Sequence, residues 1–176
     1  MVRLMKFFAY FLFFILMLMY MIPKTSIYHY AEHQLKKFDL IISGEELIDT
    51  GFSLQVNNAS LSLKSVDMAK VAEMSISIFA LYNSINIDNI YLSSMASSFI
   101  PLKIQNAKIT YSIIDPVNVN AKAYGEFGGI NAKFNLVKRL LRLELSPSKI
   151  MLKKYQSTLK NFKKSKDGVY IYEKNI

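Results

Sequence analysis

The first feature along the chain is an uncharged apolar run at residues 7–22, FFAYFLFFILMLMYMI. A helix that spans a bilayer needs about 20 such residues, and the apolar residues on either side supply the rest. A cleaved signal peptide is the alternative, but its apolar core is usually about 7–15 residues and ends at small residues, which the following IPKTS segment does not offer in the right frame. We therefore predict an uncleaved transmembrane helix at residues 7–23, anchored by Phe7, Phe11, Phe14, Leu18 and Ile22.

The flanking charges predict the orientation of this helix. Arg3 and Lys6 lie in a short tail at residues 1–6, and short basic tails normally stay in the cytoplasm. The contrast with the other side is modest, because lysines follow the helix there too. The prediction is a single-pass inner-membrane protein with residues 38–176 in the periplasm, and the lack of cysteine fits an oxidising compartment.

Directly after the anchor, residues 24–37 have helical spacing. Tyr28, Ala31, Leu35 and Phe38 recur at intervals that place them on one face of a helix. We expect a membrane-exit helix here.

Beyond residue 38 the pattern changes to strict alternation of apolar and polar residues, which is typical of antiparallel strands with one buried face. Gly- and Pro-containing turns separate the segments. The sequence predicts a mainly β protein, in which a curved antiparallel β-meander or half-barrel follows the exit helix. The alternating runs are FSLQV at 52–56, ASLSLK at 59–64, MSISIF at 74–79, INIDNIYL at 85–92, KITYSII at 108–114, VNVNAKA at 117–123 and AKFNL at 132–136.

A short motif recurs within these strands: apolar, any residue, Asn, apolar, any residue, apolar. Its asparagines are Asn58, Asn89 and Asn106. The alternation shifts phase by one residue at each Asn, so we predict a β-bulge or tight kink there. The alternative is chance recurrence in an Asn-rich β sequence. Structural turns are also predicted at Gly125, Gly128 and Gly129.

Near the end of the chain the spacing becomes helical again. Met151, Tyr155, Leu159 and Phe162 would share one face, which predicts an amphipathic helix at residues 149–163. A short final strand follows at residues 169–172.

Charge is concentrated in the same region. The chain of 176 residues carries a net charge of +9, and residues 138–176 account for +8 of it. Such a cluster can contact DNA, anionic lipid head groups or an acidic partner. The alternative is a solvated helix face. The residues concerned are Lys153, Lys154, Lys160, Lys163, Lys164 and Lys166.

One string has catalytic spacing: His29, Glu32 and His33 fit the H-x-x-E-H pattern of some zinc peptidases. We reject a metal site, because the chain has only these two histidines and the string begins six residues after the apolar run. No catalytic residues, cofactor or small-molecule substrate are predicted, so an enzyme is not expected.

Several longer segments resemble a known family. AYGEFGG at 123–129, followed by a β segment and LELSPS at 143–148, is similar to motifs of the type II secretion system protein N family, which is related to AsmA-like envelope proteins. The composition, rich in Ile, Lys, Phe and Asn, resembles that of AT-rich bacteria such as the Campylobacter group, where secretion-like machinery serves natural transformation.

The resemblance implies a non-catalytic inner-membrane subunit of a secretion or type IV pilus-like machine for DNA uptake. Its partners would be membrane lipid and other inner-membrane subunits of that apparatus, with DNA contact as a further possibility. The alternative is an AsmA- or LptC-like protein that handles envelope lipids in an apolar groove of the sheet.

Overall fold

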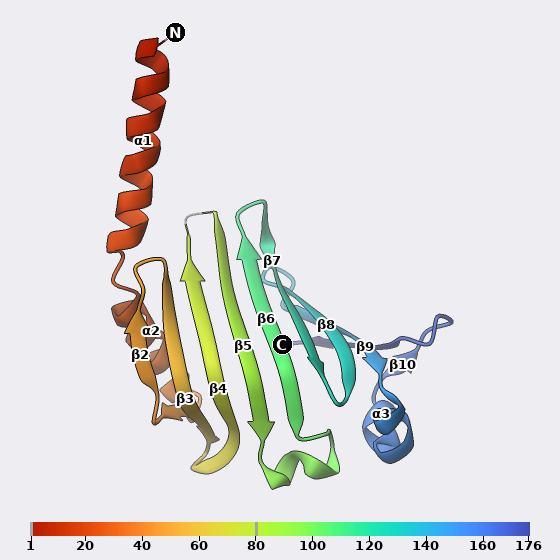
Figure 1. The fold of residues 1–176 in the computed structure, drawn as a ribbon. Helices are drawn as coiled ribbons and strands as arrows, with labels where there is room; N and C mark the ends of the chain where they lie inside the picture. The colour runs from red at the N-terminus through yellow and green to blue at the C-terminus, as the bar shows by residue number, and fades with distance from the viewer. Residues whose placement is uncertain (1, 80) are drawn as a thin grey trace.

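The protein is mostly antiparallel β structure, as the alternation predicted. A computed structural model describes residues 2–79 and 81–176. It contains an N-terminal helix and an open, curved, 11-stranded sheet with a few short helices (Figure 1). The strands follow in the order β1-β3-β4-β5-β6-β7-β8-β9-β11-β10, and β2 also pairs with β3. The central part is therefore a simple meander.

The elements have the following bounds. The helices are α1 (Val2–Met21), α2 (Lys24–Lys36), η1 (Ser94–Ser98), α3 (Lys149–Lys154) and α4 (Gln156–Leu159). The strands are β1 (Leu40–Ser43), β2 (Glu46–Asp49), β3 (Ser53–Leu63), β4 (Val66–Ile78), β5 (Tyr82–Leu92), β6 (Lys103–Ser112), β7 (Asp115–Gly125), β8 (Gly128–Asn135), β9 (Leu140–Pro147), β10 (Lys163–Lys164) and β11 (Tyr170–Asn175).

Helix α1 projects away from the sheet, and its apolar side chains are exposed along its whole described length (Figure 1). At 20 residues it is long and apolar enough to cross a membrane. The helix begins at Val2, so the segment expected to be a tail already belongs to it.

The sheet has one apolar and one polar face across almost its full width. The paired strands bring one apolar residue per strand into a single row: Leu54, Ile76, Ile85, Ile109, Ala121, Ala132, Leu143 and Tyr172. The neighbouring row on the opposite face is polar: Gln55, Ser75, Asn86, Lys108, Lys122, Asn131 and Glu144. Only the apolar face needs covering, and α2, α3 and α4 all pack on it.

Backbone irregularities in β3, β5 and β6 shift the phase of that apolar face. Asn58 in β3 and Asn89 in β5 have positive φ values of 57° and 54°. On β6 the register shift lies between Ile104 and Asn106, one residue before the predicted position. Asn106 itself lies in the strand and its side-chain amide donates to Asp88 (2.7 Å). The shift keeps Leu54, Val56, Ala59 and Leu61 in one apolar cluster on both sides of Asn58.

The predicted glycine turn is the hairpin between β7 and β8. Gly125 pairs with Gly128 across it, and a Cβ at Gly128 (φ +110°) would overlap the backbone of Ser146. Gly129 is less constrained, because its Cβ would only press on the ring of Tyr124. The tight turn delivers Phe127 into a buried cluster with Leu145.

The single C-terminal helix predicted at residues 149–163 is wrong. The segment forms two short helices broken at Tyr155 (φ −119°, ψ 36°), and Lys163–Lys164 are already in β10. Met151 and Leu159 are buried in the same cluster. On a straight helix these two positions would lie roughly 80° apart, so the break allows both side chains to reach the sheet.

The end of α1 is fixed to the sheet by close packing at the β2–β3 turn. The ring of Tyr20 lies over Gly51 (φ +85°), where any Cβ would overlap it. The same ring packs edge-on against Phe52, 5.5 Å between centroids, and Phe52 packs on Phe79 at 6.5 Å. The anchor helix therefore leaves the sheet at a defined place.

We expect Gly51→Ala to lower the free energy of unfolding more than Gly168→Ala does. Both glycines have φ near +80°, so each alanine incurs a similar left-handed strain of about 1–2 kcal/mol. Only the Cβ at position 51 also displaces the Tyr20 ring, whereas nothing lies within 4 Å of position 168. Denaturation in detergent measures both. Adding Tyr20→Ala should remove the difference, and equal losses in the two single variants would contradict the packing argument.

We also expect Asn58→Val to lower the free energy of unfolding by about 1–2 kcal/mol, because a β-branched residue strongly disfavours positive φ. Asn58→Gly should be close to neutral, since glycine adopts this conformation freely. Asn57→Val, at the neighbouring position in β3, is the matched control and should cost little. Urea unfolding separates the three variants. A loss at position 57 as large as that at position 58 would show that the backbone conformation is not the cause.

Candidate functional site

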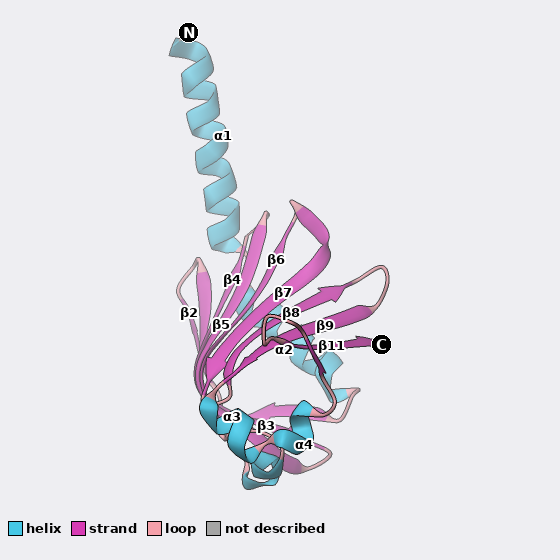
Figure 2. Cartoon of the chain, turned by 90° about the vertical axis from the view of Figure 1, so that its right-hand side faces the viewer, coloured by secondary structure: helices cyan, strands magenta, loops and turns pink. Residues whose placement is uncertain are grey.

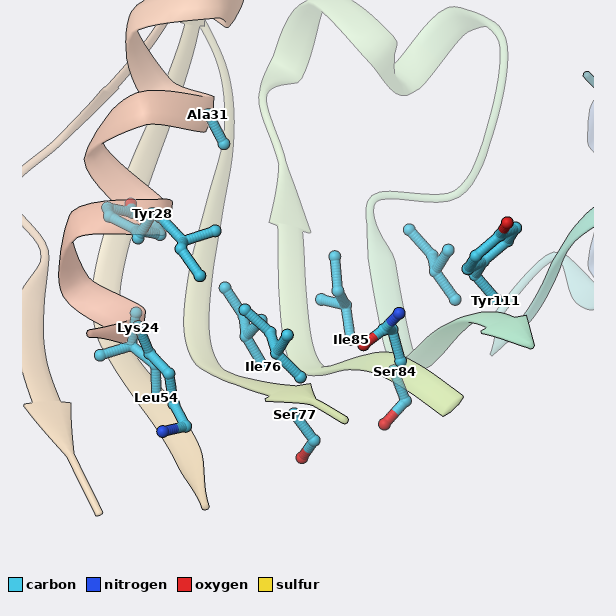
Figure 3. A pocket seen from close by; sticks show the side chains of 13 residues that line it. Lys24, Tyr28, Ala31, Leu54, Ile76, Ser77, Ser84, Ile85 and Tyr111 are labelled. Atoms are coloured by element: carbon cyan, nitrogen blue, oxygen red, sulfur yellow. The ribbon is translucent and has the colours of Figure 1, made fainter. Parts of the chain in front are cut away.

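An apolar groove lies between α2 and the exposed part of the sheet's apolar face (Figure 3). Its volume is about 280 Å³. One wall is formed by Ile27, Tyr28 and Ala31 of α2, and the floor by strand residues. The floor includes Leu54, Ile76, Ile85, Ile109 and Tyr111. The lining is largely aliphatic, so the groove suits an apolar ligand.

The groove exists because α2 covers only one side of the sheet. Tyr28 is buried against the cluster that contains Leu54 and Val56, and α2 contacts β1, β2 and β3. At the opposite side, Met151 of α3 and Leu159 of α4 cover Phe127 and Leu145. The apolar row between these two covers, such as Ile109 and Ala121, is only half-buried. The C-terminal helices thus close one part of the apolar face and leave the part beside α2 open.

Lys24 is a buried charged residue at one end of this groove, only 1% exposed. Its Nζ donates to the carbonyl oxygens of Met19 (3.3 Å) and Ile22 (3.1 Å) and lies 3.9 Å from Oδ1 of Asp49. A cation at a helix C-terminus neutralises the partial negative charge of the unpaired carbonyls. This one side chain therefore connects the end of α1, the start of α2 and strand β2.

Tyr28 is the second notable polar group in the groove wall. Its hydroxyl is buried and has no hydrogen-bond partner among the described residues. Burial, and then the nearby carboxylates of Glu45 and Glu32, raise the pKa of Tyr28 well above its usual value. With its pKa raised in this way, the hydroxyl stays protonated.

The predicted H-x-x-E-H string lies on the surface of α2. Nδ1 of His29 is 3.2 Å from Glu32, and Lys36 is 2.8 Å from the other carboxylate oxygen. These hydrogen bonds, first from Lys36 and then from His29, lower the pKa of Glu32. Among residues 2–79 and 81–176, no group of three or more His, Cys, Asp or Glu could hold a metal ion. The arrangement stabilises a helix face.

The lysine cluster predicted from the sequence is spread over several elements at the edge of the sheet far from α1, where β10 is the last strand (Figure 1). Lys153 and Lys154 are in α3, Lys160 caps α4, Lys163 and Lys164 form β10, and Lys166 follows. All are exposed. Asp167 directly follows Lys166, and the next acids along the chain, Glu144 and Glu173, both pair with Arg142. The surface is basic and faces away from the anchor.

The fold and the site together define a class: a β-sheet protein with an N-terminal helix able to span a membrane and an apolar groove where the helix meets the sheet. No protein-family model, curated protein or solved structure matches the chain. Two parts of this site escaped sequence analysis. The groove depends on how far α2 extends over the sheet, and Lys24 was counted only as a flanking charge.

Proposed function

We propose that this chain is a non-catalytic, single-pass inner-membrane subunit of a secretion or type IV pilus-like machine, with a role in DNA uptake. It positions its sheet beside the membrane as a docking platform for other subunits. The observation that carries the proposal is the fixed junction between α1 and the sheet, made by Tyr20 on Gly51 and by Lys24. A subunit that had only to be tethered would not need such a defined exit.

The charges beside α1 support an orientation with the sheet in the periplasm. Arg3 and Lys6 precede or begin the apolar stretch. On the other side, Lys24 is buried on the carbonyls of α1 and close to Asp49. Its charge is thus already compensated within the protein. The excess of uncompensated positive charge therefore lies on the side of Arg3 and Lys6, the side that the positive-inside rule assigns to the cytoplasm.

Two surfaces support docking of protein partners. The exposed lysines around α3, α4 and β10 fit an acidic partner and lie far from the anchor (Figure 2). Strand β2 lies at one edge of the sheet, and β10 covers β11 only at Tyr170 and Ile171, so another strand can pair with β2 or with the rest of β11. Both carry charged residues, Glu46 and Asp49 in β2 and Glu173 in β11, which discourage unspecific edge-to-edge association.

The test is crosslinking in native membranes combined with charge reversal. A photo-crosslinker at Lys160 should capture other inner-membrane subunits of the machine. The double variant Lys160→Glu with Lys166→Glu should lower transformation or secretion by about tenfold, because like charges across an interface cost more than 1 kcal/mol. Lys70→Glu with Lys122→Glu, on β4 and β7, is the matched control. Unchanged transformation and secretion after clean deletion of the gene would rule the proposal out.

A second function, handling of envelope lipid, is favoured by the groove beside α2. Its aliphatic lining suits an acyl chain. The groove lies at the strand ends next to α1, since Ile78 and Tyr111 near those ends also line it. A lipid could reach it directly from the membrane.

If this is correct, the purified protein should bind a fluorescent fatty acid, and Ala31→Trp should weaken binding by about tenfold by filling the groove. His33→Trp, an exposed position on the same helix that does not line the groove, should leave binding unchanged. Fluorescence titration measures both, and mass spectrometry detects co-purified lipid. Equal affinity of the two variants, or lack of any bound acyl lipid, would refute the lipid-handling function without affecting the docking proposal.

A further inference from the structure

Alternate turns of the meander lie at the same end of the strands as the base of α1 (Figure 1). We call this the anchor-side end. The β2–β3 turn contains Gly51 and Phe52, the β4–β5 turn contains Leu81, and the β6–β7 turn is Ile113–Ile114. In both ribbon views these turns reach the level at which α1 ends (Figures 1 and 2).

These turns carry large apolar side chains that are exposed to solvent. Ile114 is 90% exposed, Leu81 65%, Ile113 56% and Phe52 44%. A two-residue turn usually takes Gly, Asn or Asp. Two isoleucines at the tip between β6 and β7 contribute little to the buried core, so folding of the sheet does not account for them.

Direct contacts join the turns to one another and to the last turn of α1. Tyr20 packs on Phe52 and Phe52 on Phe79. The amide of Ile113 donates to the carbonyl oxygen of Leu81 (3.0 Å). The three tips thus form one continuous surface beside the helix end, and any membrane that α1 spans must lie against it.

The turns at the far end of the strands differ in composition from those at the anchor-side end. The β3–β4 turn there is Lys64–Ser65. In the β7–β8 turn, Phe127 is folded inward and buried. Exposed apolar side chains also occur at this end, including Phe38 beside the β3–β4 turn and Met95 and Phe99 around η1, and the η1 segment is far from α1 (Figure 1).

We propose that the three anchor-side tips, formed by Phe52, Leu81 and Ile113–Ile114, insert into the outer leaflet of the membrane that α1 spans. The sheet is then held by two attachments, the helix and the row of tips, and its strands stand upright on the bilayer. The tips sit at the boundary between head groups and acyl chains, where apolar side chains of interfacial proteins are buried. This inference does not depend on which protein the sheet contacts.

The experiment uses single cysteines, which the natural chain lacks. Ile114→Cys and, as a matched control at the far end, Met95→Cys are labelled with an environment-sensitive fluorophore. Both sites are highly exposed, so neither substitution disturbs the fold. The full-length protein is then reconstituted alone into phospholipid vesicles. Emission from position 114 should shift to the blue, and brominated lipid should quench it several-fold more than emission from position 95.

A third probe, Leu81→Cys, tests the neighbouring tip and should behave like position 114. The proposal is overturned if aqueous iodide quenches the labels at positions 114 and 81 as strongly as the label at position 95. In that outcome the apolar tips are in contact with water, and a protein partner becomes the expected occupant of this surface. It is equally overturned if the emission at position 114 is the same in detergent-free vesicles with and without brominated acyl chains.

Discussion

The contact between the end of α1 and the β2–β3 turn determines where the helix that is apolar enough to span a membrane leaves the sheet. It requires a residue without a Cβ at position 51, because the Tyr20 ring occupies that space. It also requires Lys24, whose charge caps the carbonyls at the end of α1 and approaches Asp49 of β2. Aromatic packing and a buried cation together fix the direction in which α1 leaves the sheet.

From that fixed point, the geometry of the sheet decides which surfaces lie beside the end of α1 and which lie away from it. Antiparallel strands place alternate turns at the end beside α1, and the apolar tips are found there. The basic residues of α3, α4 and β10 collect at the edge of the sheet far from α1. The irregularities at Asn58 and Asn89 keep the same face of the sheet apolar on both sides of these residues. The groove next to α2 therefore continues into the core.

Local patterns predicted much of this architecture. Alternation identified most strands of the meander, and the phase shifts identified the irregularities in β3 and β5, because side-chain direction in a strand follows from position alone. The irregularity in β6 was misplaced by one residue, since the motif marks Asn106 and the backbone shift falls at Gln105. Strands β1 and β2 were missed because four residues are too few to show alternation. Strand β9 was missed although LRLEL at 141–145 does alternate, and β10 was missed because the predicted helix extended to Lys163.

By itself, the sequence determined the properties that repeat along one element: an apolar helix able to span a membrane, a two-faced sheet and a basic C-terminal region. Each arises from periodicity or from local composition. Tertiary structure alone decided the break at Tyr155, the burial of Lys24 beside Asp49 and the groove left uncovered by α2. These depend on contacts between segments distant in sequence, which no local period records.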